Sequence, residues 1–238
     1  QFNSHVMQTY DRLPLVMESG SGRTCTDEDG KRYLDFGSGI GTNSLGYCDP
    51  AWADAVCAQV RSMQHTSNYY YTKVQADFAE RLCQITGYKR VFFGNSGAEA
   101  NECAIKLARK YSFDKYGAGR NVIITLRNSF HGRTMATLSA TGQDCFHNYF
   151  FPFPEGFVYA EANDIDDLLK KMHNNVCAVM LEYIQGEGGV VPLDSKYVDQ
   201  LYDFCAKRDI LVIADEVQTG VGRTGTFLAG EQYAKKAD

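Results

Sequence analysis

Short apolar runs alternate with longer amphipathic stretches along the chain beyond Tyr88. The runs have the length and composition of buried strands, and the stretches between them have the spacing of helices. This alternation predicts an α/β domain with a mainly parallel sheet. The expected strands are RVFFGN (90–95), NVIITLRN (121–128), GFVYA (156–160), CAVMLEYI (177–184) and ILVIADE (210–216), and the expected helices span 97–117, 164–172 and 195–207.

The first part of the chain has a different pattern, in which short strands are broken by turns between Leu15 and Phe36. Asp29-Gly30 is a strong hairpin turn signal. Two helices are expected next, at 50–63 and at 74–86, because these stretches have helical spacing and the second is closed by a glycine. We therefore predict an amino-terminal segment with short antiparallel strands over residues 1–49 and a large domain over residues 50–238.

Composition and charge restrict the class of protein. The 238 residues are 44% hydrophobic and 22% charged, with a net charge of −5, which is ordinary for a globular protein. The acidic balance and the lack of a basic run argue against nucleic acid or a membrane as a partner. No apolar segment reaches the roughly 18 residues of a membrane span. The eight cysteines are scattered without a CxxC pair, so we expect no metal site, no disulfide framework and a reduced, cytoplasmic setting.

Four polar or glycine-rich loops follow predicted strands, and sites in parallel sheets lie at the carboxyl ends of the strands. The loops are NSGAEAN, NSFHGRT, QGEGG and DEVQTG. In the first of them, Ser96 and Gly97 stand where a strand turns into a helix. Their backbone N–H groups and hydroxyl suit a phosphate. A helix cap without a ligand is the simpler interpretation of this turn taken alone.

The next two loops contain candidate binding groups. Phe130 could stack on a planar ligand, and Arg133 could bind a carboxylate with two parallel hydrogen bonds; the alternative is a core phenylalanine and a surface arginine in an ion pair. His131 between them could be a base, although a lone histidine is more often structural or solvated. Glu182 ends a strand, and Glu187 lies within the glycine loop, where it could neutralise an arginine or bind an ammonium group. Taken alone, this loop is slightly more typical of a solvated acid.

Asp215 raises a sharper question, because a carboxylate at the end of a buried strand needs a cationic partner or hydrogen bonds. A pyridinium nitrogen would serve, and the paired ring would then act as an electron sink for carbanion chemistry. A metal is the rival, but only Asp215 and Glu216 are at hand, without a histidine. A nucleotide with magnesium would need the usual lysine-bearing phosphate loop, which is missing.

Taken together, the segments NSGAEANECAIKLARK, NSFHGRT, EYIQGEGGV and IADEVQTGVGRTG resemble the class III aminotransferases, which depend on pyridoxal 5′-phosphate. The likeness runs from Tyr10 to the end of the chain and is strongest to the acetylornithine group, with the ornithine group nearby. It implies a fold-type I large domain with a mainly parallel sheet, preceded by part of the small domain, with the carboxyl-terminal part absent.

The resemblance also implies the cofactor contacts. Ser96, Gly97 and Ala98 would hold the phosphate, and Phe130 would stack on the pyridine ring. Asp215 would be the catalytic residue that pairs with the ring nitrogen. Gln218 would lie near the phenolic oxygen of the ring.

For the substrates, the resemblance implies that Arg133 clamps a carboxylate and that Glu187 masks a second arginine until the dicarboxylate arrives. Tyr10 matches a substrate-facing tyrosine. The implied reaction transfers the terminal amine of N-acetylornithine to 2-oxoglutarate, in arginine biosynthesis, with ornithine or succinylornithine as alternative donors. A homodimer is expected for the full-length form.

The end of the chain bears on activity. In the family, the Schiff-base lysine follows the segment that EQYAKKAD matches, and Lys235 and Lys236 align ahead of it. We therefore expect this chain to be a truncated aminotransferase that is inactive alone. The alternative is a fragment that binds the cofactor or a partner without catalysis. We also expect the isolated chain to self-associate through exposed sheet edges.

Overall fold

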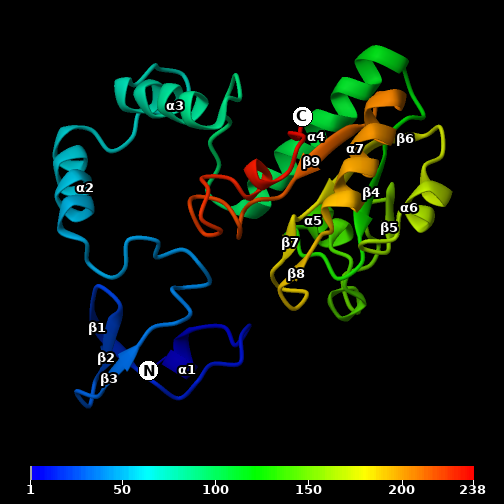
Figure 1. The fold of residues 1–238 in the computed structure, drawn as a ribbon. Coiled ribbons are helices and arrows are strands. Elements are labelled where there is room, and N and C mark those ends of the chain that lie inside the picture. Colours follow the sequence, from blue (N-terminus) through cyan, green and yellow to red (C-terminus); the bar gives the residue numbers. More distant parts are fainter. Residues whose placement is uncertain (1) are drawn as a thin grey trace. The chain divides into compact units, whose positions relative to one another are not determined.

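The structure is a computed structural model that describes residues 2–238, and it divides into two compact units, Gln1–Tyr70 and Tyr71–Asp238 (Figure 1). This division falls later than the predicted boundary after residue 49, because the helix α2 (Pro50–Ser62) groups with the first unit. Each unit is described by itself. Among residues 2–238, no helix is long and apolar enough to cross a membrane.

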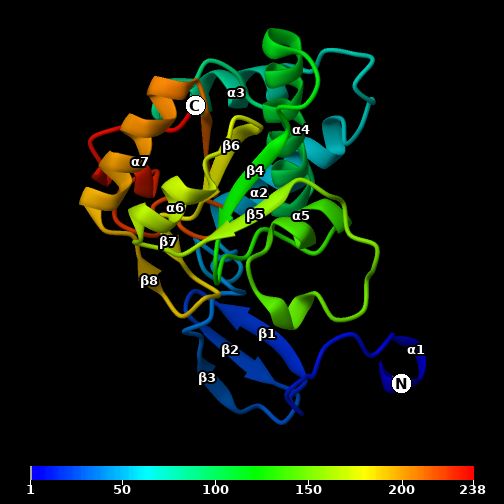
Figure 2. The same cartoon turned by 90° about the vertical axis from the view of Figure 1, so that its right-hand side faces the viewer.

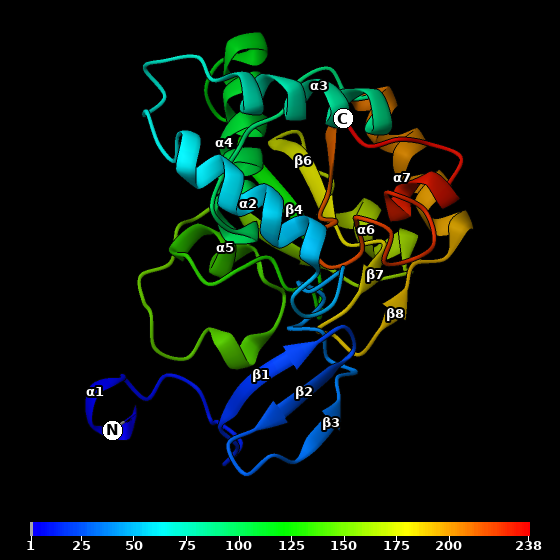
Figure 3. The same ribbon diagram turned by 90° about the vertical axis from the view of Figure 1, so that its left-hand side faces the viewer.

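The first unit contains a three-stranded antiparallel sheet in the order β1-β2-β3 (Figure 3). Its turn forms at the predicted position, where Asp27 accepts hydrogen bonds from the backbone N–H of Asp29 and Lys31, at 3.1 and 2.8 Å. Gly30 adopts a φ of 79°, which a residue with a side chain adopts at a cost. The elements besides α2 are α1 (Phe2–His5), β1 (Met17–Ser21), β2 (Thr24–Asp27) and β3 (Arg32–Leu34).

The second unit is built on a four-stranded, wholly parallel sheet in the order β5-β4-β6-β9. Its strands are β4 (Val122–Leu126), β5 (Phe157–Ala160), β6 (Val176–Leu181) and β9 (Leu211–Ala214). The helices are α3 (Lys73–Thr86), α4 (Gly97–Tyr116), α5 (Met135–Ala140), α6 (Ile165–Lys171) and α7 (Ser195–Arg208). A short hairpin, β7 (Ile184–Gln185) with β8 (Val191–Pro192), and two 3₁₀ turns, η1 (Asp144–Phe146) and η2 (Ala229–Gln232), complete it.

Helices cover both faces of this sheet, with α4 and α5 on one side and α6 and α7 on the other (Figure 2). Every residue of β6 is buried, as expected for a central parallel strand. Ile124 and Leu201 belong to one core cluster, and Ile105 and Met180 belong to the other. The predicted α/β architecture is therefore confirmed, with four of the five expected strands in one parallel sheet.

The prediction of a fifth strand, RVFFGN, is wrong, because residues 90–95 form neither a strand nor a helix. A strand needs a neighbouring strand to pair its N–H and C=O groups. The edge strands of the described sheet are β5 and β9, and neither of them pairs with residues 90–95. Phe92 is largely exposed, and Phe93 stacks on Phe78 with ring centroids 5.9 Å apart. An apolar run alone therefore does not decide strand formation here.

The edge strand β9 borders an apolar groove of about 470 Å³, lined among others by Leu107 and Ile213. We expect the purified chain to self-associate there, because exposed apolar side chains beside an edge strand favour contact with another chain, although Asp238 already pairs with Val212 of that edge through its N–H and Oδ2. Leu107→Glu should shift the weight-average mass in light scattering toward the monomer. Val190→Glu, a change at a similarly exposed position outside the groove, should not. A monodisperse wild-type monomer would contradict this expectation.

Candidate functional site

The buried carboxylate of Asp215 lies at the carboxyl end of β9 and is 6% exposed. Its Oδ2 accepts hydrogen bonds from Nδ2 of Asn101 at 2.7 Å and from Nδ1 of His131 at 2.8 Å. Its Oδ1 accepts one from the backbone N–H of Val217 at 3.0 Å. These three donors offset the cost of burying the charge and leave Oδ1 with room for a further donor.

Close backbone approaches hold the predicted loops together at this edge of the sheet. A Cβ at Gly97 would lie 2.6 Å from Cγ1 of Val217, so the first turn of α4 packs directly on the loop after β9. A Cβ at Gly132 would lie 2.8 Å from that of Ala98. The loops after β4 and β9 and the start of α4 therefore converge, as the sequence predicts.

The amino terminus of α4 is capped by Ser96, whose Oγ accepts from the backbone N–H of Glu99 at 3.1 Å. The Glu99 carboxylate in turn accepts from the backbone and side-chain nitrogens of Asn95. Within the described part of the chain, the N–H groups of Gly97 and Ala98 have no protein acceptor. The turn is therefore a capped helix that still presents two N–H groups and the positive end of its dipole to an anion.

An aromatic surface lies beside this turn. Phe130 is half-buried and packs edge-on against Phe146, with ring centroids 5.8 Å apart. The Arg133 guanidinium lies 6.0 Å from the Phe130 ring centroid and 5.6 Å from that of Phe146. A planar ring and a cation are thus placed together near the end of β4.

Glu182 is a second buried carboxyl, at the end of β6. Its Oε2 accepts from the backbone N–H of Phe130 at 3.0 Å. Burial raises the pKa of Glu182 to about 7; the charge of Asp215 also raises it, whereas His131 and the N–H groups of Phe130 and Gly186 lower it. The pKa of Glu182 therefore lies near neutral pH, well above the usual range of a glutamate carboxyl.

Three of the predicted residues take no part in these contacts. The Gln218 side chain is exposed and rests on Gly186, where it would meet any added Cβ. Glu187 is exposed in the loop between β7 and β8. Tyr10 belongs to the first unit and is 59% exposed. The roles of these three residues stay predictions.

Asn101 is a functional candidate that the sequence reasoning missed. It lies on the face of α4 that also buries Ile105 and Ala108, so a polar side chain stands where the helical spacing calls for a core residue. That irregularity was the available signal, because a polar side chain at a core position needs a partner. The partners are Asp215 and the backbone oxygen of His131, at 2.8 Å.

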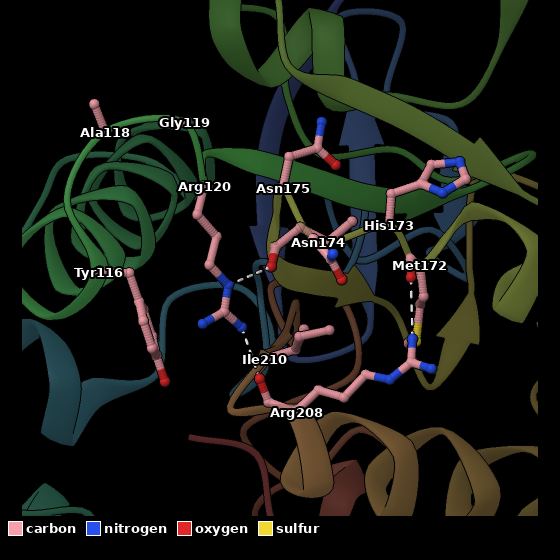
Figure 4. Close-up of a pocket in the computed structure, with 11 residues that line it drawn as sticks. Tyr116, Ala118, Gly119, Arg120, Met172, His173, Asn174, Asn175, Arg208 and Ile210 are labelled. Atoms are coloured by element: carbon pink, nitrogen blue, oxygen red, sulfur yellow. Dashed lines mark hydrogen bonds between the residues drawn. The ribbon is translucent and has the colours of Figure 1, made fainter.

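A pocket of about 960 Å³ lies at the opposite, amino-terminal edge of the sheet (Figure 4). Arg120 donates from Nε to the Val176 oxygen and from Nη2 to the oxygens of Arg208 and Asp209. Arg208 donates from Nη1 to the Met172 oxygen. Arg120 thus binds main-chain carbonyls at the end of α7, and Arg208 binds that of Met172 at the end of α6; a cation at the carboxyl end of a helix complements its dipole. This arrangement is structural.

The Glu182 pKa has a consequence for stability. In the folded protein the Glu182 carboxyl favours its protonated form. Its contribution to the free energy of unfolding is therefore fully present below pH 4.5 and is lost as the pH rises through about 7. Glu182→Gln should remove this loss and raise the free energy of unfolding by about 3 kcal/mol above pH 7 relative to the wild type. Urea unfolding at several pH values between 4 and 8 measures the difference, and parallel profiles would contradict it.

Comparison with known proteins agrees with this arrangement. The sequence model of the family described as "Aminotransferase class-III" matches residues 6–238. An acetylornithine aminotransferase of Haemophilus ducreyi is 53% identical over 99% of this chain and 60% of its own length, and one of Methanocaldococcus jannaschii is 45% identical over 98% and 58%. The chain thus spans about 60% of the length of the curated relatives it matches.

Solved structures give the same result. The ornithine aminotransferase of Toxoplasma gondii superposes with a TM-score of 0.94 at 33% identity, over all of this chain and 57% of that one. The N-acetylornithine aminotransferase of Stenotrophomonas maltophilia gives a TM-score of 0.85 at 36% identity, over all of this chain and 59% of that one.

Proposed function

Because the chain belongs to the class-III aminotransferases, which depend on pyridoxal 5′-phosphate, we propose that it forms the cofactor-binding part of an enzyme of arginine biosynthesis. In that enzyme the terminal amino group of N-acetylornithine would pass to 2-oxoglutarate. The names of the matched relatives support this donor. A homodimer in the cytoplasm is part of the same proposal.

The residues at the carboxyl edge of the sheet suit this cofactor. Asp215 has a free acceptor position on Oδ1 and would pair with the ring nitrogen. The Gly97 and Ala98 N–H groups with the Ser96 hydroxyl would hold the phosphate, and Phe130 would lie against the ring. When bound, pyridoxal phosphate supplies an electron sink for negative charge on the substrate carbon.

The protein groups would do three things in the reaction. Asp215, fixed by Asn101 and His131, would keep a proton on the ring nitrogen by its charge. Arg133 would orient a substrate carboxylate. Glu187 and Tyr10 would select between the amino donor and the dicarboxylate, as in the family that the motifs resemble. Gln218 would bind the phenolic oxygen of the ring.

Two alternatives have support. Ornithine as the amino donor is supported by the T. gondii ornithine aminotransferase, with its TM-score of 0.94; succinylornithine is a further donor to test. The second alternative is a fragment that binds the cofactor or a partner without catalysis, since the resemblance places the reactive lysine after Asp238. We expect the 238 residues alone to transfer no amino group.

The observation that supports the proposal most is the buried Asp215, which accepts three hydrogen bonds and keeps one acceptor position on Oδ1, at the edge where the predicted loops converge. To test the proposal, the protein is incubated with pyridoxal phosphate and reduced with borohydride. Its intact mass is then measured, and any adduct is located by peptide mapping. One stoichiometric pyridoxyl adduct on a lysine after Asp238 would identify a competent aminotransferase. A single adduct on Lys235 or Lys236 would contradict the expected register of the tail.

A further inference from the structure

The side chain of Asn101 joins three segments that are far apart in the sequence. It belongs to α4 and is 5% exposed. Its Nδ2 donates to Oδ2 of Asp215 at 2.7 Å and to the backbone oxygen of His131 at 2.8 Å. Asp215 follows β9, and His131 lies in the loop after β4. A helix and two loops are therefore held together by one buried amide group.

The two partners determine which residue type can make these contacts. A carboxylate and a carbonyl oxygen only accept hydrogen bonds, so both contacts require a donor. The –NH₂ group of asparagine supplies two donors from one atom, whereas a serine hydroxyl supplies one and an ionised aspartate supplies none. A flipped amide would place Oδ1 against two acceptors in a buried position, so the Asn101 amide has a single orientation.

These contacts also make the two oxygens of Asp215 different from each other. Oδ2 accepts from Asn101 at 2.7 Å and from Nδ1 of His131 at 2.8 Å, and two donors fill its two lone pairs. In the described part of the chain, Oδ1 accepts one hydrogen bond, from the Val217 N–H at 3.0 Å. Asn101 and His131 thus occupy one oxygen and leave the acceptor position on the other.

The same helix also presents the N–H groups that suit a phosphate. Gly97 and Ala98 begin α4, and Asn101 follows Gly97 by about one turn, roughly 6 Å along the axis and on the same face. The first turn of α4 also packs on the loop after β9, because a Cβ at Gly97 would lie 2.6 Å from Cγ1 of Val217. The bond from Asn101 to Asp215 therefore fixes the carboxylate relative to the phosphate-facing turn.

We propose that Asn101 is a positioning residue that holds the two ends of the cofactor site at a set distance. It ties the Asp215 carboxylate to the start of α4, and it directs Oδ1 rather than Oδ2 toward the ring nitrogen. Asn101 acts through Asp215 and does not touch the cofactor. Groups that are fixed before the ligand arrives reduce the cost of binding. This inference rests on the proposed function.

The test compares the affinity of the 238-residue chain for two probes by calorimetry. One is inorganic phosphate, and the other is pyridoxine 5′-phosphate, which has the ring and phosphate of the cofactor but no aldehyde to react with surface lysines. Asn101→Ala should raise the Kd for pyridoxine phosphate about tenfold, the effect of one hydrogen bond to a charged group. The Kd for inorganic phosphate should stay unchanged, because the N–H groups of Gly97 and Ala98 remain.

Asn101→Asp is the second variant, and it serves if the alanine variant does not fold. It keeps the size of the side chain but places a second carboxyl against Asp215 and the His131 oxygen. We expect it to weaken the binding of pyridoxine phosphate more than the alanine variant does, because neither acceptor then has an amide donor and the two acids repel each other.

Ser112→Ala is the matched control. Ser112 lies on the same buried face at the other end of α4, and its Oγ donates to the backbone oxygen of Arg120 at 2.6 Å. Its loss removes a buried hydrogen bond from the same helix and should lower stability, but it should leave both Kd values unchanged. If Asn101 were merely structural, its alanine variant would behave in the same way.

Three results would count against these statements. Wild-type affinity for pyridoxine phosphate in an Asn101 variant that folds would overturn the inference and leave the proposed function standing. An equal loss of affinity for both probes in Asn101→Ala would also overturn it, since a loosened helix would give that result. A wild-type chain that binds no pyridoxine phosphate would overturn the proposed function, and the inference with it.

Discussion

Replacing Asp215 with alanine is expected to weaken the binding of pyridoxal phosphate by ~100-fold and to lower the free energy of unfolding by about 3 kcal/mol. The binding loss follows because truncation of one partner of a buried charge pair costs about 2–5 kcal/mol. The stability loss follows because Asn101, His131 and the Val217 N–H would lose their common acceptor in a buried site. Cofactor titration by absorbance and urea unfolding measure the two effects.

Two further variants separate charge from packing. Asp215→Asn keeps the shape of the side chain and removes its charge. The loss in free energy of cofactor binding should therefore be at least as large as the loss in free energy of unfolding. Asp203→Ala removes an exposed carboxylate that pairs with Lys235, and it should change stability by less than about 1 kcal/mol and leave the cofactor affinity unchanged. Equal affinities for wild type and Asp215→Ala would show that the cofactor binds elsewhere.

Gly142→Ala is expected to have the second large effect, a loss of about 3 kcal/mol of stability, because overpacking against a backbone atom forces the main chain to move. An added Cβ would overlap the carbonyl oxygen of Leu126. Gly142 also donates its N–H to Oγ of Ser129 at 3.0 Å, and its oxygen accepts from the Asn128 N–H at 2.9 Å. These contacts fix the loop that contains Phe130, so cofactor affinity should fall as well.

Gly37→Ala is the control for this substitution. Neither glycine has a positive φ, and a Cβ at Gly37 would meet nothing closer than 3.5 Å. We expect the Gly37 variant to unfold at the wild-type urea concentration. A Gly142 variant that does the same would mean that the loop after β4 relaxes without cost, and the account of how that loop is held would be wrong.

Most of the second unit could be predicted because its signals are local. The apolar runs of β4, β5, β6 and β9 each stand between a turn and a helical pattern, and Gly87 ends α3 in the left-handed conformation, with φ of 68°. The segment 90–95 has the same composition but forms no strand. Whether this segment forms a strand depends on a partner strand within hydrogen-bonding distance, and the residues of the segment itself do not specify one.

The same distinction applies to the site. Ser96, Phe130 and Asp215 could be selected from the sequence, because each follows a strand or begins a helix. Their connections could not, since Asn101 and Asp215 are 114 residues apart and Phe130 and Glu182 are 52 apart. A buried histidine and a solvated one have the same sequence signal, and only the fold places His131 against Asp215.

The central claim is that the convergent loops form a site for pyridoxal phosphate with Asp215 at the ring nitrogen. A crystal structure of the chain soaked with pyridoxal phosphate tests it most directly. We predict the ring nitrogen within hydrogen-bond distance of the Asp215 carboxylate, and the phosphate on the N–H groups of Gly97 and Ala98. A cofactor bound away from Asp215, for example on surface lysines, would contradict the claim.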